Sequence, residues 1–105
     1  MSNYIEYLRK YVGHSPILTS GVLLFLFNDK GEVLMQLRSD NNAWGFPGGS
    51  MELGESLEEV ARRELYEETN LVVDELKFLT ILSGKDTYNV YPNKDEVYSV
   101  TAVYE

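Results

Sequence analysis

The apolar residues of this chain recur at different intervals in different segments, and each interval predicts a type of structure. Near the N-terminus, Ile5, Leu8 and Val12 recur at helical spacing. Residues 1–13 are therefore expected to hold a short amphipathic helix that ends at Gly13 and packs against the rest of the chain.

The following segments have the composition of strands. Residues 17–27 are rich in Val, Leu and Phe, which predicts a strand buried on both faces. Residues 32–38 alternate and are expected to pair with it across a turn at 28–31. Further strands are predicted at 76–83, 87–91 and 96–104.

A second helix is predicted at 57–69, because Ser56 and Glu59 form a capping box just before it. At 100° per residue, one face of this helix begins with hydrocarbon and ends with acid. That face carries Leu57, Val60, Ala61, Glu64, Glu67 and Glu68. Like charges one turn apart repel each other, and the C-terminal end of a helix dipole repels anions. A solvated acidic face is the alternative, but acids that continue an apolar stripe favour a bound cation.

The order of these elements is helix, strands, helix, strands. It predicts one α/β domain over residues 1–105, of the α+β type, with a mixed sheet and helices on its faces. A length of 105 residues supports one core and not two.

Residues 49–71 carry the most specific pattern in the chain. They begin with Gly and continue with five residues, Glu55, seven residues and then Arg-Glu-Leu-Tyr-Glu-Glu-Thr-Asn-Leu. This resembles the Nudix hydrolase signature, Gly-x5-Glu-x7-Arg-Glu-apolar-x-Glu-Glu-x-Gly-apolar, except that Asn70 replaces the last Gly. Because Asn is second only to Gly in the left-handed conformation, Asn70 is expected to preserve the end of the helix.

The resemblance implies a Nudix-type α/β/α sandwich in which the signature forms a loop, a helix and a loop. Such domains normally continue into further sheet and a second long helix. Here the chain stops inside the strand expected at 96–104, so the resemblance implies that the C-terminal helix is missing. Sheet surface left uncovered in this way favours self-association, for example as a homodimer.

The resemblance also implies a reaction. Nudix hydrolases cleave a pyrophosphate bond in a nucleoside diphosphate linked to another group, which includes substrates such as ADP-ribose or nucleoside triphosphates. The cofactor would be Mg²⁺, with Mn²⁺ as a substitute, because hard cations prefer oxygen ligands. Its expected ligands are Glu64, Glu67 and Glu68, with the carbonyl of Gly48 or Gly49 in addition.

Arg63 borders the acidic face without pointing at the metal. It is expected to pair with Glu55 or Glu67 and so to hold a carboxylate in place. Glu55 is then the partner of this arginine, which is the preferred interpretation, or a water-mediated metal ligand. Glu64 is the first candidate for the general base. Asp95 or Glu96 is the second candidate, or else both are simple turn acids in front of a strand.

Residues that contact the substrate are less clearly marked. Trp44 is expected either to stack on a base or to pack on the glycine loop at 47–49. Arg38 is expected to contact a phosphate, or else to be a solvated strand end. Tyr88, Tyr91 and Tyr98 either line a pocket or form cross-strand pairs. His14 has no acid near it in the sequence and is expected to be structural.

Composition narrows the class of protein. The net charge of −8 argues against nucleic acid as a partner, because binding of its backbone rests on Lys and Arg. The chain has no Cys, so a reducing cytoplasm is the expected location. Its longest apolar stretch, residues 21–27, is too short for a membrane span.

Three classes of function remain. They are a Mg²⁺-dependent pyrophosphohydrolase, a catalytically silent nucleotide-binding sensor, and a domain that binds no nucleotide. The first is favoured, because a silent module has no need to keep acids that cost stability.

Overall fold

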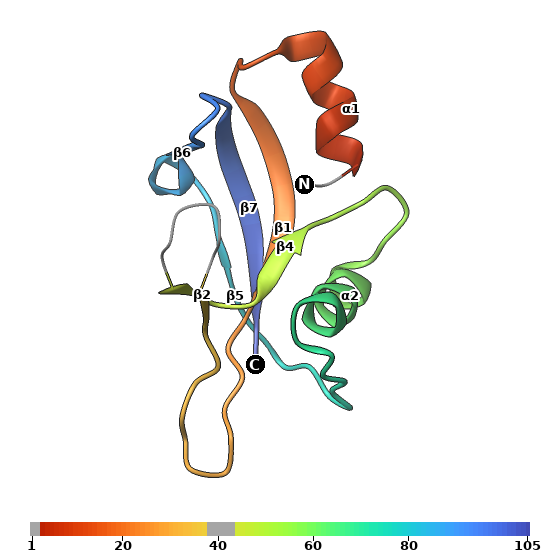
Figure 1. Ribbon diagram of the computed structural model, residues 1–105, viewed down its shortest axis with the longest axis vertical. Coiled ribbons are helices and arrows are strands. Elements are labelled where there is room, and N and C mark those ends of the chain that lie inside the picture. Colours follow the sequence, from red (N-terminus) through yellow and green to blue (C-terminus); the bar gives the residue numbers. More distant parts are fainter. Residues whose placement is uncertain (1–2, 38–43) are drawn as a thin grey trace.

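A computed structural model describes residues 3–37 and 44–105. Its elements are α1 (Asn3–Val12), β1 (Ile17–Leu24), β2 (Gln36–Leu37), β3 (Trp44–Gly45), β4 (Gly48–Ser50), α2 (Leu57–Thr69), β5 (Phe78–Leu82), the 3-10 helix η1 (Lys85–Thr87), β6 (Asn89–Val90) and β7 (Glu96–Tyr104) (Figure 1). No helix in the described part of the chain is long and apolar enough to cross a membrane.

The main sheet is mixed, as the order of elements predicts. Its strands follow the order β4-β1-β7-β5, and β6 also pairs with β7. β1 and β7 run parallel from the pair Ile17 and Val97 to the pair Leu24 and Tyr104. The other pairs are antiparallel, and β2 and β3 form a small sheet of their own. The α+β prediction is confirmed.

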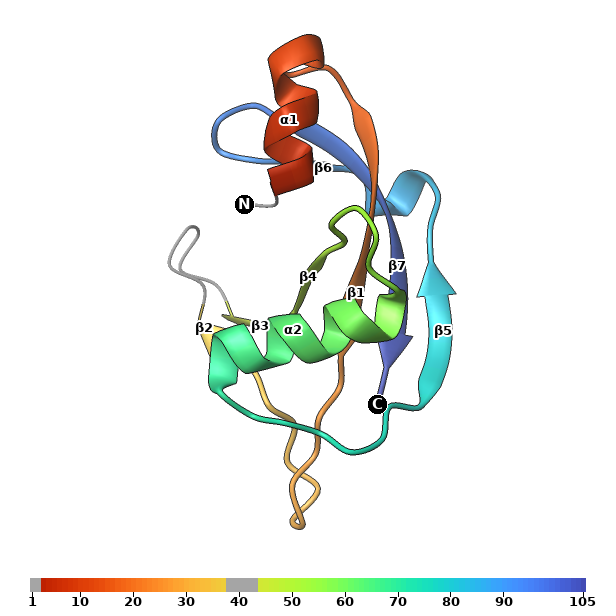
Figure 2. The same cartoon turned by 90° about the vertical axis from the view of Figure 1, so that its right-hand side faces the viewer.

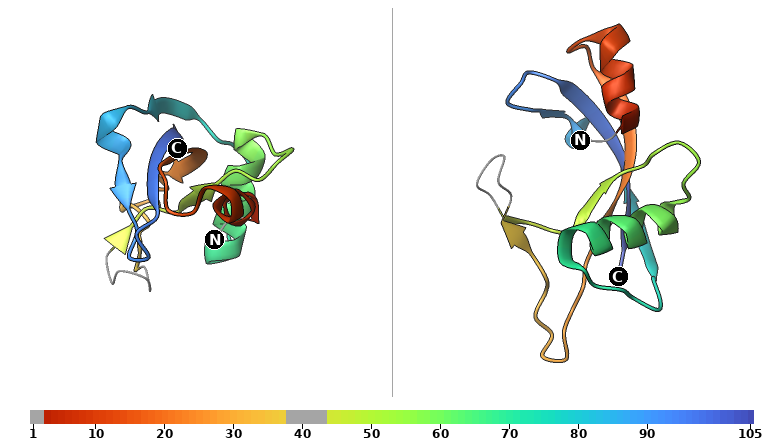
Figure 3. Two further views of the ribbon diagram at one scale, coloured as in Figure 1. Left: turned by 90° about the horizontal axis from the view of Figure 1, so that it is seen from above. Right: turned by 45° about the vertical axis from the view of Figure 1, so that its right-hand side comes forward.

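Both α-helices lie on the same side of β1 and β7, as the view from above shows (Figure 3, left). α2 crosses the lower part of this face of the sheet in Figure 2. α1 lies at the top of the same view, near the upper ends of β1 and β7. Alternate residues of β1 and β7 point towards α2, since Val22 pairs with Ala102 and Leu24 with Tyr104. The buried core consists of Val22, Leu24, Val60, Ala61, Leu65, Ala102 and Tyr104.

The prediction for residues 17–27 is wrong in extent and burial. β1 ends at Leu24, and the side chain of Leu18 is 74% exposed. The strand is covered on the α2 face only over its second half, where α2 packs against it. The segment after Leu24 instead leaves the sheet as the neck of a hairpin, bridged between Phe27 and Val33.

The predicted turn at 28–31 is present, with Gly31 at φ 76°. The strand expected at 32–38 is shorter than predicted. Residues 32–34 pair with residues 26–28 across the turn, as predicted, but the segment beyond them does not continue this pairing. Only β2 is a strand there, and it pairs with β3 rather than with β1. Alternation predicted that this segment is extended, but it carried no information about which strand lies beside it.

The C-terminal strands follow the prediction with shorter bounds. β7 spans 96–104 as predicted, whereas β5 and β6 are shorter than expected and η1 stands between them. Part of the reason is Thr87, whose hydroxyl accepts the hydrogen bond of the Ser99 N–H at 3.1 Å. A side chain there replaces the carbonyl that a longer β6 would offer.

Candidate functional site

The bounds of α2 are set by local contacts, as the capping box predicts. The Ser56 side chain accepts from the Glu59 N–H at 3.2 Å, and Glu59 Oε1 accepts from the Ser56 N–H at 3.0 Å. At the other end, Asn70 adopts the left-handed conformation with φ 62°, and its N–H donates to the Tyr66 carbonyl. Asn70 therefore keeps the helix end that the signature normally obtains from Gly.

The inward face of α2 differs from the predicted one in two residues. Val60, Ala61 and Leu65 are fully buried, and Leu65 was not among the residues expected on that face. Glu67 lies outside it, with its side chain 57% exposed. The helix is turned so that its buried stripe runs through Ala61 and Leu65, which leaves Glu67 at the rim.

Arg63 connects the acids of this region. Its Nε donates to Glu55 Oε2 at 2.6 Å and its Nη2 to Glu55 Oε1 at 2.8 Å, which makes a two-pronged ion pair. Nη1 donates to Glu64 Oε1 at 2.8 Å and to Glu67 Oε2 at 3.4 Å, and Nη2 to the Ser50 carbonyl at 3.1 Å. Arg63 pairs with both expected partners, and Glu55 is the main one.

The two acids beside Arg63 have opposite electrostatic environments. Hydrogen bonds from Arg63 hold the pKa of Glu55 below its ordinary value. Burial raises the pKa of Glu64, and this effect exceeds the opposing one of Arg63, while the charges of Glu68 and Glu67 raise it further. The ionised form of Glu64 is thus disfavoured mainly by burial, although Arg63 contacts it.

Two glycines of β4 bring the main chain close to these acids. The Gly48 N–H donates to Glu68 Oε2 at 3.2 Å. At Gly49 the Glu64 carboxylate occupies the space that a Cβ would need, with all three of its end atoms less than 3.0 Å from that point. β4 and α2 therefore meet where Gly48, Gly49, Glu64 and Glu68 lie together.

A divalent cation fits the chemistry of this group. Its donors are hard oxygens, and Glu64 is a half-buried acid beside the like charges of Glu68 and Glu67. Within residues 3–37 and 44–105, however, no three His, Asp or Glu side chains form a ready-made metal site. Arg63 and the Gly48 N–H hold the carboxylates instead, so a cation would have to replace these contacts.

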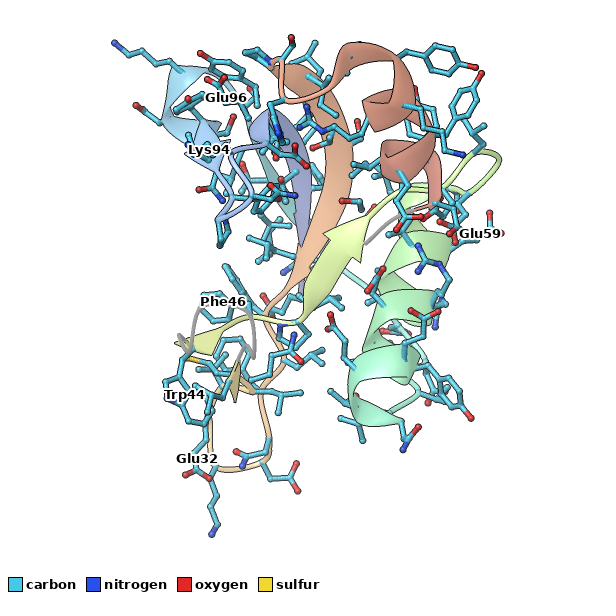
Figure 4. The ribbon with its side chains drawn as sticks, turned by 45° about the horizontal axis from the view of Figure 1, so that its top comes forward. Glu32, Trp44, Phe46, Glu59, Lys94 and Glu96 are labelled. Carbon is cyan, nitrogen blue, oxygen red and sulfur yellow. The ribbon has the colours of Figure 1, made fainter. Side chains whose placement is uncertain are left out.

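The second candidates for the general base lie elsewhere. Asp95 is only 6% exposed and contacts His14 Nδ1 at 2.6 Å and Arg9 Nε at 3.4 Å. Glu96 begins β7 and is labelled at the top of Figure 4, whereas α2 packs against the opposite end of this strand. The structure does not bring either acid to α2.

His14 does have an acid partner, contrary to the expectation from its sequence neighbours. The partner, Asp95, stands 81 positions further along the chain and becomes a neighbour only through folding.

Trp44 is 65% exposed on β3, and it is Phe46 that packs inward, on Phe25, with ring centroids 4.6 Å apart (Figure 4). Arg38 lies outside the described residues. Tyr88, just before β6, packs on Tyr98 of β7 with tilted rings whose centroids are 5.1 Å apart, which agrees with the alternative of a pair between neighbouring segments.

Sequence reasoning missed Glu52 altogether. Its carboxylate accepts the N–H groups of Asn3 and Tyr4 at the start of α1, at 3.1 and 2.9 Å. The partners are 48 and 49 residues apart, and no local pattern in the sequence marks such a contact.

Comparison with known proteins assigns this chain to a family. The NUDIX domain model matches residues 18–105, and the chain belongs to the Nudix family. The matched range includes β1, β4, α2 and β7, so the acid cluster lies inside the shared domain.

Curated relatives cover part of the chain. An RNA pyrophosphohydrolase of Acinetobacter baylyi is 34% identical over 79 residues, which is 70% of this chain and 48% of that protein. A putative 8-oxo-dGTP diphosphatase of Bacillus subtilis is 41% identical over 51 residues, which is 49% of this chain and 34% of that protein. The chain spans less than half the length of these relatives.

Solved structures agree on the fold. A MutT/nudix family protein from Enterococcus faecalis is 27% identical with a TM-score of 0.59, over 97% of this chain and 43% of that one. A MutT protein from Methanosarcina mazei Go1 is 24% identical with a TM-score of 0.65, over 85% of this chain and 64% of that one. The predicted Nudix fold is confirmed.

Proposed function

We propose that this chain belongs to a pyrophosphohydrolase that uses a divalent cation to cleave a pyrophosphate bond in a nucleotide-type substrate. The observation that carries the proposal is the acidic end of α2. Glu64 and Glu68 are half-buried there against the glycines of β4. Arg63, held by Glu55, contacts Glu64, and the Gly48 N–H donates to Glu68. Half-buried like charges cost stability, which is consistent with selection for binding a cation.

The proposed ligands are Glu64, Glu67 and Glu68, with the carbonyl of Gly48 or Gly49. Mg²⁺ is the proposed ion and Mn²⁺ the substitute, because both accept carboxylate and water oxygens. When bound, such an ion neutralises phosphate charge and makes a bound water more acidic.

The chain's own residues supply the other functions. Glu64 is the proposed general base, because its carboxylate lies against Gly49 among the other acids of α2 and is within hydrogen-bond distance of Arg63. Arg63, held by Glu55, keeps the Glu64 carboxylate in one orientation. Arg63 and Glu55 thus act by positioning Glu64.

The substrate class rests on the names of the relatives. These name RNA and 8-oxo-dGTP, so nucleoside triphosphates and RNA both belong among the candidates, besides ADP-ribose. The RNA pyrophosphohydrolases stand against the exclusion of nucleic acid that the net charge suggested. Trp44, exposed on β3, offers a ring face for a base, and Arg38 remains the proposed phosphate contact.

The test is phosphate release from a panel of ADP-ribose, nucleoside triphosphates and 5′-triphosphorylated RNA oligonucleotides. Hydrolysis is expected with Mg²⁺ or Mn²⁺, and none with a chelator. Glu68→Gln is expected to remove activity, whereas Glu32→Gln, at an exposed acid directly after the 28–31 turn, serves as a control with the same charge change. If the wild type binds nucleotides but hydrolyses none of them, and Glu68→Gln leaves that binding unchanged, the silent sensor replaces the enzyme. Cytoplasmic location and homodimer formation remain predictions.

A further inference from the structure

α1 is held to the rest of the molecule mainly at its two ends. None of its apolar side chains is fully buried, and Arg9, 11% exposed, is its most enclosed ion-pairing side chain. At its start, the Glu52 carboxylate accepts the N–H groups of Asn3 and Tyr4, an arrangement favoured by the positive end of the helix dipole. In Figures 1 and 2 this end of α1 points towards the loop between β4 and α2, which contains Glu52.

The other end of α1 is fixed to the beginning of β7. Arg9 Nη2 donates to the Glu96 carbonyl at 2.8 Å, and Arg9 Nε lies 3.4 Å from Asp95 Oδ2. Asp95 Oδ1 also contacts His14 Nδ1, at 2.6 Å. The helix thus spans two loops that are far apart in the sequence.

Packing beneath α1 is incomplete. A pocket of 310 Å³ lies between the helix, β1 and the 50–55 segment, with Tyr4, Ile5, Leu18 and Leu53 among its walls. Leu18 and Leu53 remain 74% and 78% exposed. Apolar contact therefore contributes little to the position of the first turn of α1, and the Glu52 carboxylate attaches this turn to the 51–56 loop.

Glu52 also touches the site through its main chain. Its N–H donates to Glu55 Oε1 at 2.9 Å, and this same oxygen accepts Arg63 Nη2 at 2.8 Å. From Arg63 the contacts continue to Glu64 and Glu67. One residue thus joins the start of α1 to the ion pair that braces the acidic cluster.

We infer that Glu52 is a positioning residue, through which α1 holds the 51–56 loop in the conformation that keeps Glu55 on Arg63. α1 precedes the residues matched by the family model, 18–105. The inference deepens the proposed function and rests on it for its effect on cation binding.

The direction of the effect follows from the competition for Arg63. Glu55 accepts from Nε and Nη2 of the guanidinium, whereas Glu64 and Glu67 both accept from Nη1. When the loop loosens, Glu55 withdraws and Arg63 settles on Glu64 and Glu67, where it competes with a cation for the same oxygens. Releasing Glu52 should therefore weaken divalent cation binding.

The experiment compares Glu52→Gln and Glu52→Ala in the full chain. Glu52→Gln removes the charge and one of the two acceptor oxygens, so that the NH₂ group of the new side chain faces one of the two N–H donors. Glu52→Ala removes both acceptors. Glu6→Gln is the matched control, because Glu6 is an exposed acid on the same helix. The readouts are amide hydrogen exchange by NMR, the exchange of the Arg63 Nε–H, and Mn²⁺ affinity from the EPR signal of free Mn²⁺.

Both Glu52 variants should speed the exchange of the Asn3, Tyr4 and Glu52 amides and of the Arg63 Nε–H. The dissociation constant for Mn²⁺ should rise about tenfold, the scale for partners that orient metal ligands, with little change in Glu6→Gln. Faster exchange confined to α1, with the Glu52 amide and the Mn²⁺ affinity unchanged, would overturn the inference. If the wild type binds no Mn²⁺, the proposed function fails, and exchange at Glu52 and Arg63 alone decides the inference.

Discussion

The carboxylate of Glu64 lies in the space that a side chain at Gly49 would fill. A Cβ added at Gly49 would stand less than 3.0 Å from the Cδ and both oxygens of Glu64. The signature glycine therefore has a steric reason in this chain: it lets β4 pass directly beneath a half-buried acid of α2.

Gly49→Ala should displace Glu64 while preserving the fold. The atoms in the way belong to the end of a flexible side chain, which can turn aside at small cost. Because a catalytic group moved by about 1 Å loses about 100-fold in rate, kcat should fall by about that factor. Tm, measured by circular dichroism, should change by only a few degrees, on the order of a loss of 1 kcal/mol.

Gly48→Ala is the matched control one position earlier. Its Cβ would meet the main-chain carbonyl of Val22, which cannot move aside without disturbing the pairing of β1 with β4. A large drop in Tm is expected for Gly48→Ala and a small one for Gly49→Ala. Equal drops in the two variants would contradict the explanation.

The coupling between Arg63 and Glu55 can be measured by a double-mutant cycle. The single variants Arg63→Ala and Glu55→Ala and their combination are unfolded with urea, and their free energies of unfolding are compared. A coupling of about 1 kcal/mol is expected, because the pair is two-pronged but still partly exposed. Arg63→Lys should recover little of it, since an ammonium group cannot donate to both oxygens in that geometry. Additive losses in the cycle would show that the pair is not a brace.

The features that the sequence predicted correctly are those that contacts between residues close in the chain determine. The bounds of α2 at 57–69 follow from Ser56 with Glu59 at one end and Asn70 at the other, all within a few residues of each other. The pairing of Arg63 with Glu55 is likewise short-range, at a separation of eight residues, and the signature fixes their relative position.

What could not be predicted depends on packing between distant segments. The exposure of Glu67 follows from the rotation of α2 on the sheet, and a helical wheel cannot fix that rotation. The pairing of β2 with β3, the contact of His14 with Asp95 and that of Glu52 with α1 join segments whose sequences carry no shared pattern.

The opposite pKa shifts of Glu55 and Glu64 predict opposite effects of pH on stability. Arg63 lowers the pKa of Glu55, so this acid's contribution is present above its ordinary value of 4.5 and is lost as the pH falls through the lowered value. Burial raises the pKa of Glu64, so its contribution is present below 4.5 and is lost as the pH rises through the raised value.

Two glutamine variants separate these contributions in thermal unfolding with a chelator present. At pH 7, Glu55→Gln should melt below the wild type and Glu64→Gln above it. The difference for Glu64→Gln should vanish as the pH falls to 4.5, whereas that for Glu55→Gln should shrink only below 4.5. A Glu64→Gln variant that melts below the wild type at pH 7 would mean that the charge of Glu64 is fully compensated by Arg63.

Substitutions of Asn70 test whether Asn serves as well as the signature Gly at the left-handed end of α2. The φ of Asn70, 62°, is in the left-handed region. This conformation costs most residues about 1 to 2 kcal/mol, whereas it costs Gly and Asn less. Asn70→Ala should lower the free energy of unfolding in urea by about 1 kcal/mol. Asn70→Gly should stay within about 0.5 kcal/mol of the wild type. Since Glu68 lies two residues before Asn70, a helix end that frays in Asn70→Ala should also weaken Mn²⁺ binding, and Asn70→Gly should not. Equal stability of the two variants would show that the left-handed turn does not depend on the residue at position 70.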